Sequence, residues 1–186
     1  YTDGFETVNP IGVHKKVHKL NGIYFTLGNI ESNKQGPLKL IRLVALGKVV
    51  DIKQFSMESY WKPLIDDLRI LEDDGLKVPN TDIILKGTAT VVCADNLGSH
   101  ELGGFLESFG PQVKKICRFC LADRPPLLAS HSPYQFQRRT KETHEEHVKT
   151  VTSDPSQSSN FGVKANCPLN KLKYCHVITS LCPDIM

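Results

Sequence analysis

The sequence lacks any run of 18 apolar residues, so it predicts no membrane-spanning helix. It also shows no secretory signal peptide, no Asn-x-Ser/Thr glycosylation sequon and no internal repeat. A large excess of charge of one sign is missing too, because 23 basic and 20 acidic residues leave a net charge of only +3. Affinity for phosphate depends on clustered charge, so this balance does not by itself identify a nucleic-acid-binding protein.

What is present suits one medium-sized domain or a domain with an insertion. The chain has 186 residues, and 40% of them are hydrophobic, which is enough for a sizeable core. It begins at Tyr1 rather than Met and stops at Met186 within an apparent structured element, so we expect a fragment of a longer chain. Six unevenly spaced cysteines, two of them in a C-x-x-C, favour a reducing, intracellular setting with a metal site over a disulfide framework.

Residues 88–100 form the stretch around which the chain is organised. Small, β-branched and apolar residues predict a buried strand that stops at Asp95. Asn96 and Gly98 then break the strand, and residues 102–109 predict a helix that Gly110 and Pro111 close. Asp95 therefore has two interpretations: it caps the turn or helix, or it binds a cation at the edge of the core.

Other elements follow from periodicity and turn chemistry. We expect a strand ending near Asp3, strands over 21–27 and 38–50 forming an antiparallel hairpin, and a strand over 83–94. An apolar stripe at helical spacing predicts a helix over 56–75, with Ser56 as N-cap and Gly75 after its end. Its acids are expected on the solvated face; they are Asp66, Asp67, Glu72, Asp73 and Asp74.

The second half of the chain has weaker signals. Residues 127–136 are typical of a loop, and residues 138–151 are charged with helical propensity. Residues 152–160 have the composition of a flexible linker.

Two pairs of metal-ligand residues occur in this half. Cys117 and Cys120 form the C-x-x-C, and His144 and His147 lie one helical turn apart. Thiolate and imidazole pairs suit tetrahedral Zn²⁺, so we predict a zinc site that staples an insertion. The alternative is a buried cysteine pair and two surface histidines. Other side chains compete as ligands, namely His131, Cys167, Cys175 and His176.

A pair of acids gives a second candidate site. Asp3 and Asp95 end two predicted strands, and they meet at one edge if those strands are neighbours in the sheet. Mg²⁺ binds few protein carboxylates together with phosphate and water oxygens. Two such ions about 4 Å apart activate a water or hydroxyl and stabilise a leaving oxygen in phosphodiester chemistry. A third acid normally completes such a site, and Asp184 is the candidate near the chain end.

Five segments, taken together, carry a family resemblance. They are Asp3-Gly4-Phe5, Asn9-Pro10-Ile11-Gly12, Ala94-Asp95-Asn96-Leu97-Gly98-Ser99-His100, Cys117-Arg118-Phe119-Cys120 and Pro183-Asp184-Ile185-Met186. The chain resembles the catalytic domain of cut-and-paste DNA transposases of the acidic-triad (DDE) type, in particular the CACTA (En/Spm)-like group of transposon-derived reading frames. The resemblance covers nearly the whole chain.

The resemblance implies an α/β, ribonuclease-H-like fold: a mixed five-stranded sheet with flanking helices and a zinc-stapled insertion. It implies a core over 1–110, a cysteine/histidine insertion over 111–151, and a linker and return segment toward the third acid over 152–186. Asp3 and Asp95 would be the first and second acids, His100 the histidine that often follows the second, and Cys117 and Cys120 the zinc thiolates. The family's last acid lies just beyond an Asp-Ile-Met sequence, and this chain stops at Met186, so we expect it to be catalytically crippled.

The function expected from the resemblance is that of a fragment of a metal-dependent DNA transposase, using Mg²⁺ or Mn²⁺ for hydrolysis and strand transfer. It would bind the double-stranded DNA of transposon ends in the nucleus, as a homo-oligomer. Candidate phosphate contacts are His14, Lys15, Lys16, His18, Lys114, Lys115, Arg138 and Arg139. The basic patch over 14–19 is alternatively a solvated loop. A different class, a non-catalytic zinc-containing DNA- or protein-binding module, and a decayed reading frame without selected function are the other interpretations.

Overall fold

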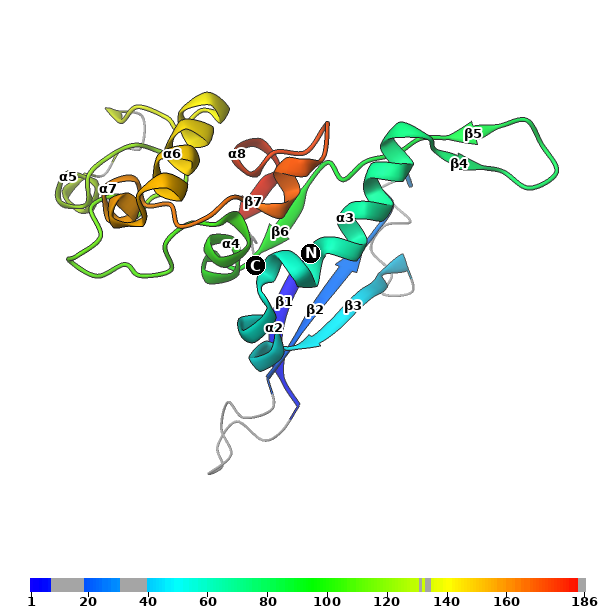
Figure 1. Ribbon diagram of the computed structural model, residues 1–186, viewed down its shortest axis with the longest axis horizontal. Helices are drawn as coiled ribbons and strands as arrows, with labels where there is room; N and C mark the ends of the chain where they lie inside the picture. Colours follow the sequence, from blue (N-terminus) through cyan, green and yellow to red (C-terminus); the bar gives the residue numbers. More distant parts are fainter. Residues whose placement is uncertain (8–18, 31–39, 131, 133–134, 184–186) are drawn as a thin grey trace.

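The computed structural model describes residues 1–7, 19–30, 40–130, 132 and 135–183 (Figure 1). Several predicted site residues lie outside this part of the chain: His14, Lys15, Lys16, His18, His131 and Asp184. In the described part, small sheets and several helices alternate along the chain, which confirms the α/β class.

The first sheet has three antiparallel strands in the order β1-β2-β3. These are β1 (Thr2–Glu6), β2 (Lys19–Phe25) and β3 (Arg42–Lys48), so the predicted hairpin of β2 and β3 is confirmed. The register shifts between Ile23 and Tyr24, which marks a bulge.

Two boundaries in this sheet differ from the prediction. Asp3 lies within β1 rather than at its end, because β1 pairs with β2 from Thr2 to Glu6 and holds Gly4 in the ladder instead of a turn. The strand expected over 38–50 ends at Lys48, because helix α2 (Val49–Phe55) begins there. Only Ile52 is buried in α2.

Helix α3 (Met57–Asp73) confirms the clearest prediction from the sequence. The Ser56 side chain accepts a hydrogen bond from the backbone N–H of Ser59, which caps the first turn. The chain leaves the helix at Gly75, whose φ of +80° is the left-handed conformation that favours glycine.

The apolar face of α3 packs on the first sheet. Trp61 and Ile65 are each 2% exposed and share a core with Ile23 of β2. The Tyr60 hydroxyl donates a hydrogen bond of 2.8 Å to the carbonyl of Asn21. The predicted helical stripe therefore faces the sheet.

One of the acids of α3 departs from the solvated face. Glu72 is 6% exposed, and its carboxylate accepts hydrogen bonds from the Thr88 hydroxyl and from the backbone N–H of Lys173. It lies buried because two distant segments supply donors for both of its oxygens. The carboxylate thus joins α3 to the second half of the chain.

The strand predicted over 83–94 is interrupted. Residues Ile84–Leu85 form β5, which pairs with β4 (Leu76–Lys77) in a hairpin that projects from the body (Figure 1). Only Val92–Ala94 form β6, which pairs in parallel with β7 (Leu181–Pro183) near the end of the described chain. Two different partners divide the predicted strand, and the chain bends between them near Gly87.

The three-stranded sheet and the β6–β7 pair lie against each other, since β6 contacts β1. The amino group of Tyr1 interacts electrostatically with Cys93 on β6. At the other end, Glu101 beyond β6 interacts with Lys19, which pairs with Glu6. The chain therefore advances in the same direction along β1 and β6.

Helix α4 (Asn96–Gly103) begins and ends six residues earlier than the helix predicted over 102–109. It ends because Gly104 adopts φ +71° and closes the last turn, with the Phe105 N–H donating to His100 O at 2.9 Å. A Cβ at Gly104 would lie 2.1 Å from the carbonyl oxygen of Ala165, so this close approach requires glycine.

Short helical elements build the rest of the chain. They are α5 (Arg124–Ala129), α6 (Lys141–Ser153), η3 (Pro155–Gln157), α7 (Ser158–Phe161), η4 (Pro168–Lys171) and α8 (Val177–Ser180). The helix predicted over 138–151 corresponds to α6, whereas α5 occupies part of the predicted loop.

The prediction of a flexible linker over 152–160 is wrong, because η3 and α7 occupy most of these residues. Asp154 caps η3 by accepting a hydrogen bond from Ser156 N, and the Ser159 hydroxyl donates to the carbonyl of Gln112 at 2.5 Å. The polar residues that suggested flexibility are used as caps and tethers.

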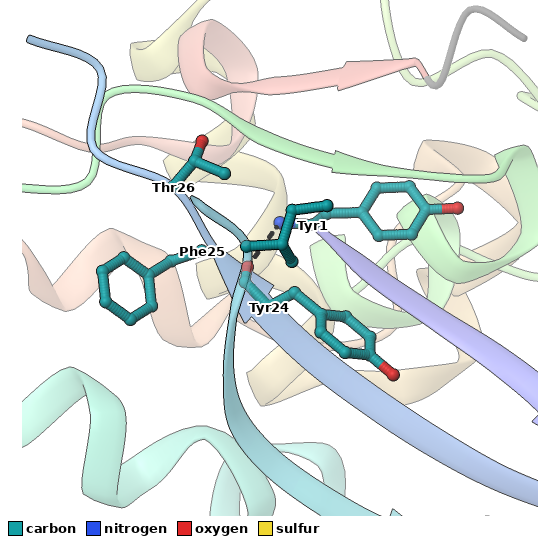
Figure 2. Close-up of a pocket in the computed structure, with 5 residues that line it drawn as sticks. Tyr1, Tyr24, Phe25 and Thr26 are labelled. Carbon is teal, nitrogen blue, oxygen red and sulfur yellow. Dashed lines mark hydrogen bonds between the residues drawn. The ribbon is translucent and has the colours of Figure 1, made fainter. Parts of the chain in front are cut away.

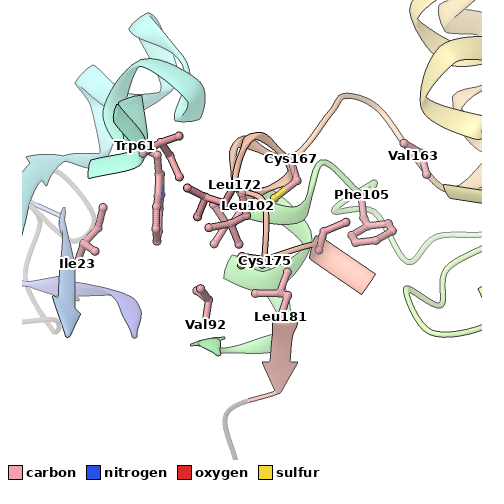
Figure 3. Packing of buried hydrophobic residues seen from close by; sticks show 13 residues of the cluster. Ile23, Trp61, Val92, Leu102, Phe105, Val163, Cys167, Leu172, Cys175 and Leu181 are labelled. Atoms are coloured by element: carbon pink, nitrogen blue, oxygen red, sulfur yellow. The ribbon is translucent and has the colours of Figure 1, made fainter. Parts of the chain in front are cut away.

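One apolar cluster joins both halves of the chain (Figure 3). It runs from Ile23 and Trp61 through Leu102 to Val163 and Leu181. The domain boundaries predicted at residues 110 and 151 stay predictions. Within the described ranges, no helix combines the length and apolar character needed to cross a membrane.

Candidate functional site

Asp95 directly follows β6, as predicted, and is exposed at the start of α4. Its Oδ1 accepts a hydrogen bond of 2.6 Å from the backbone N–H of Gly98, so the capping interpretation is correct. The cap uses one carboxylate oxygen. Oδ2 accepts no hydrogen bond within the described ranges, which leaves it free to bind a cation.

Asp3 lies half-buried on β1, the strand that contacts both β6 and α4. Thr2 pairs with the core residue Ile23, so alternation directs Asp3 to the face of the sheet opposite α3. Its carboxylate accepts hydrogen bonds from Gly4 N at 2.7 Å and from the Tyr1 hydroxyl at 3.4 Å. The two predicted acids therefore sit on neighbouring strands. We call this region, from Asp3 to Asp95, the acidic rim.

His100, the histidine implied to follow the second acid, is turned inward and is 3% exposed. Its Nδ1 lies 2.7 Å from the carbonyl oxygen of Leu106, and its ring packs against Phe105 and Phe109. Burial, and secondarily the cation of Arg118, lowers its pKa. His100 therefore supports the fold beneath the acidic rim as a neutral imidazole.

Arg118 was not among the predicted site residues, yet it lies beside this rim. It is 4% exposed, and its Nη1 donates to Asn96 Oδ1 at 3.3 Å, next to Asp95. It also interacts electrostatically with Cys182 on β7. Its position inside the Cys117-x-x-Cys120 motif is the only signal that could have singled it out in the sequence.

The predicted zinc thiols lie together in one turn. The Cys117 and Cys120 thiols are hydrogen-bonded neighbours, and burial raises the pKa of Cys120. Backbone pairing joins this turn to the segment before α6, through a Cys120–Arg138 bridge and an Arg139 N–H bond to the Phe119 carbonyl. The segment that leads into α6, the helix that carries both histidines, is thus paired with the cysteine turn.

The two histidines of α6 differ in their surroundings. His144 is fully buried, its two ring nitrogens have no hydrogen-bond partner, and burial lowers its pKa to about 3. His147 stacks on Phe161, and its Nδ1 lies 3.0 Å from Nη1 of Arg139. Among the described residues, no three His, Cys, Asp or Glu side chains are grouped closely enough to hold a metal ion.

Arg139 lies between these two pairs. Its guanidinium interacts with both Cys117 and Cys120, donates to the carbonyl of Phe161 and contacts His147. Burial lowers its pKa to about 10. It is 3% exposed, and both of its terminal nitrogens are bonded within the chain, so neither of them is free to donate to a phosphate.

The other competing zinc ligands belong to different surroundings. Cys167 and Cys175 lie in the apolar core, and burial raises the pKa of Cys167 to about 12. The His176 ring lies 5.8 Å from that of His144 and caps α8 through Nδ1, which accepts from Ile178 N. Its Nε2 is buried without a hydrogen-bond partner and lies 3.8 Å from Oε1 of Glu145.

The remaining described candidates for phosphate contact fall into two groups. Lys114 and Arg138 are exposed. Lys115 is tied to its own loop, because it pairs with Asp123 at 2.8 Å and donates to the carbonyl of Leu121 at 2.7 Å.

A pocket of about 310 Å³ opens at the start of the first sheet (Figure 2). Tyr1, Tyr24, Phe25, Thr26 and Ile41 line it, and the Tyr1 amino group donates to the Tyr24 carbonyl at 3.0 Å. None of the described residues that line it is an acid, a histidine or a cysteine.

We compared the chain with protein-family models, with curated proteins and with solved structures, and none of the three comparisons finds a match.

Proposed function

We propose that the acidic rim binds Mg²⁺ or Mn²⁺ and carries out phosphodiester chemistry on double-stranded DNA, as in the transposases that the sequence resembles. The observation that carries this proposal is the contact between β1, which bears Asp3, and β6, which Asp95 directly follows. Acids on adjacent strands can share a metal ion, whereas acids on opposite edges of a sheet cannot.

The arrangement around the rim supports the ribonuclease-H-like assignment. Antiparallel β1–β3 lie beside parallel β6 and β7, which gives a mixed set of strands, and the acids fall on the first strand and directly after β6. Asp184 remains the proposed third acid and lies outside the described residues. Nuclear location and self-association are further predictions from the resemblance.

Bound metal ions would lower the pKa of a coordinated water and neutralise charge that develops on the phosphate. The protein's own contribution at this site would be to orient two carboxylates. The helix cap fixes the rotamer of Asp95 through Gly98 N, while the Gly4 N–H and the Tyr1 hydroxyl orient Asp3.

The direct test is binding of Mn²⁺, whose paramagnetism broadens the NMR signals of nearby amides. We expect broadening at β1 and at the start of α4, and loss of it in Asp95→Asn. Asparagine keeps the cap on Gly98 but removes the charge, so folding should survive. Asp154→Asn is the matched control, because Asp154 also caps a helical turn but lies on η3.

Nicking of supercoiled DNA with Mg²⁺ or Mn²⁺ tests the chemistry. Any activity should fall at least about 100-fold in Asp95→Asn, as loss of metal-site residues commonly does, and stay unchanged in Asp154→Asn. Full metal binding and full nicking in Asp95→Asn would end the catalytic proposal.

A second candidate function is a zinc-containing DNA- or protein-binding module without chemistry. Its supporting observation is the cysteine turn paired to the segment before α6. Zn²⁺ held by Cys117, Cys120, His144 and His147 would use one of the two buried ring nitrogens of His144, once Arg139 has moved aside. Such a site would be structural.

Zinc content measured by native mass spectrometry tests this candidate. We expect one Zn²⁺ per chain, lost in Cys117→Ser, with Cys175→Ser as the control for a buried cysteine in the core. A pure binder should hold DNA in a salt-dependent manner that Mg²⁺ does not alter. A chain that folds without zinc and has the same stability in Cys117→Ser contradicts the zinc site.

A further inference from the structure

Arg118 carries a buried positive charge that no carboxylate of the described residues accompanies. Its Nε is buried and has no hydrogen-bond partner in the described chain, and the one hydrogen bond found there goes to the neutral Asn96 side chain. Among the same residues, the ionisable groups that interact with it are the His100 ring and the thiols of Cys117 and Cys182. The Phe119 ring lies 4.5 Å from the guanidinium.

Such an arrangement is costly unless an anion completes it. Removing a guanidinium from water without a counter-charge costs several kcal/mol, and arginine does not escape this cost by losing its proton. Arg139, the other deeply buried arginine, differs because both of its terminal nitrogens have partners. Arg118 therefore retains donor capacity for a ligand.

The position of Arg118 indicates what that ligand is. Asn96 is the first residue of α4 and follows Asp95. Cys182 pairs with Cys93 across β6 and β7, so the guanidinium lies at the carboxyl ends of both strands. Asn96 and Phe119 are exposed, which places Arg118 just below the surface.

The start of α4 adds to the positive potential. Gly98 N is used by the Asp95 cap, but the amides of Asn96 and Leu97 make no hydrogen bond within the described ranges. Free amides at a helix N-terminus attract anions, and a planar guanidinium matches two oxygens of a phosphate.

We propose that Arg118, together with Asn96 and the first amides of α4, binds a backbone phosphate of DNA beside the acidic rim. In this role Arg118 orients the phosphodiester against the metal-binding carboxylates. The identity of the phosphate as DNA rests on the proposed function, whereas the anion site itself rests on the unpartnered guanidinium.

The Nε–H signal of Arg118 reports the site directly by NMR. With EDTA present, so that no divalent metal contributes, inorganic phosphate and then a DNA duplex are titrated into the unsubstituted chain. We expect a saturable shift of the Arg118 signal. The Nε–H of Arg139, equally buried and also without a partner, is the internal control and should not move. No shift at Arg118, or equal shifts at both arginines, overturns the proposal.

Variants separate this site from the proposed catalysis. Arg118→Gln should weaken binding of DNA in EDTA about tenfold, the equivalent of one charge-assisted hydrogen bond, whereas Asp95→Asn should not weaken it. Loss of Mn²⁺ binding at the rim with an intact Arg118 shift would refute the catalytic proposal alone. If Asp184→Asn moves the Arg118 signal before phosphate is added, a carboxylate of the chain itself is the counter-ion and the anion site is wrong. The NMR titration stands even where a variant of the buried arginine fails to fold.

Discussion

The first sheet with α3 and the chain from residue 105 to residue 183 are stabilised in different ways. On the sheet side, backbone ladders satisfy the main chain and Ile23, Trp61 and Ile65 form an apolar interface. The later region has short helical turns, and its interior holds arginines and histidines among the apolar side chains.

The difference shows in the buried polar atoms that lack partners. On the sheet side, among the described residues, these are Oε2 of Glu6 and Nε1 of Trp61. In the later region they are more numerous, and all belong to basic side chains, namely Arg118, Arg139, His144 and His176. Natural interiors rarely leave such groups unsatisfied. Ligand or metal binding would therefore change the energetics of this region more than those of the sheet, and four measurements test this contrast.

The largest expected effect lies on the sheet side. Trp61→Ala should lower the free energy of unfolding by about 3–5 kcal/mol, because it leaves a cavity between α3 and the sheet. Ile70→Ala on the same helix is the control; its side chain is 56% exposed, so the change should stay within about 0.5 kcal/mol. Urea denaturation measures both, and equal effects would contradict the packing described here.

The second effect concerns the link between the two regions. Glu72→Ala should cost about 2–3 kcal/mol, because the Thr88 hydroxyl and the Lys173 N–H would lose their buried acceptor. Glu72→Gln keeps one acceptor oxygen and should cost about half as much. The exposed Asp67→Asn serves as the control for removal of a carboxylate from α3. If Glu72→Ala leaves the free energy of unfolding unchanged, the two regions are coupled only through the apolar core.

The third effect is the pH dependence of stability. Burial holds the pKa of His100 in the folded chain below its ordinary value of 6.5, so below pH 6.5 the unfolded chain binds the proton more readily. Stability should therefore fall as the pH drops from 6.5 toward the folded pKa, by at most about 1.4 kcal/mol per pH unit from this group, and be insensitive to it above pH 7.

His100→Asn checks that assignment. The asparagine amide can still donate to the Leu106 carbonyl but does not titrate, so the slope of stability against pH should become shallower. The buried His144 and His176 and the half-buried His147 also have lowered pKa values, and they keep the rest of the slope. An unchanged slope would show that His100 is not buried as a neutral ring.

The smallest effect is local to the later region. Thr140 and Thr143 form a reciprocal capping box at the start of α6, so Thr140→Ala should cost about 1 kcal/mol. Thr140→Ser keeps the hydroxyl and should be close to neutral. Thermal unfolding followed by circular dichroism distinguishes the two, and similar losses in both would point to the Thr140 methyl group instead of the cap.

Local signals made much of the first region predictable. Local signals specify α3: the Ser56 cap, the stripe containing Trp61 and Ile65, and Gly75. The predicted ends of this helix lie within one helical turn of the observed ends. Errors arose where two elements compete for one segment. The strand predicted over 83–94 is divided because β5 pairs with β4 while β6 pairs with β7, and partners so far away in the chain leave no local mark.

The candidate sites divide in the same way. The sequence predicts that Asp95 follows a buried strand, and it does. That Glu72 leaves the solvated face, that Arg139 lies beside the predicted zinc ligands, and that Arg118 stands at the acidic rim all depend on contacts between distant segments.

The sequence by itself determined the caps, the amphipathic α3 and the hairpin of β2 and β3, because these depend on neighbours within a few residues. Only the tertiary structure decided that β1 lies against β6 and that residues 92–94 pair with residues 181–183. The physical reason is that burial of apolar area and pairing of strands stabilise contact with any compatible segment of the chain. Which partner is chosen emerges only when the whole chain packs at once.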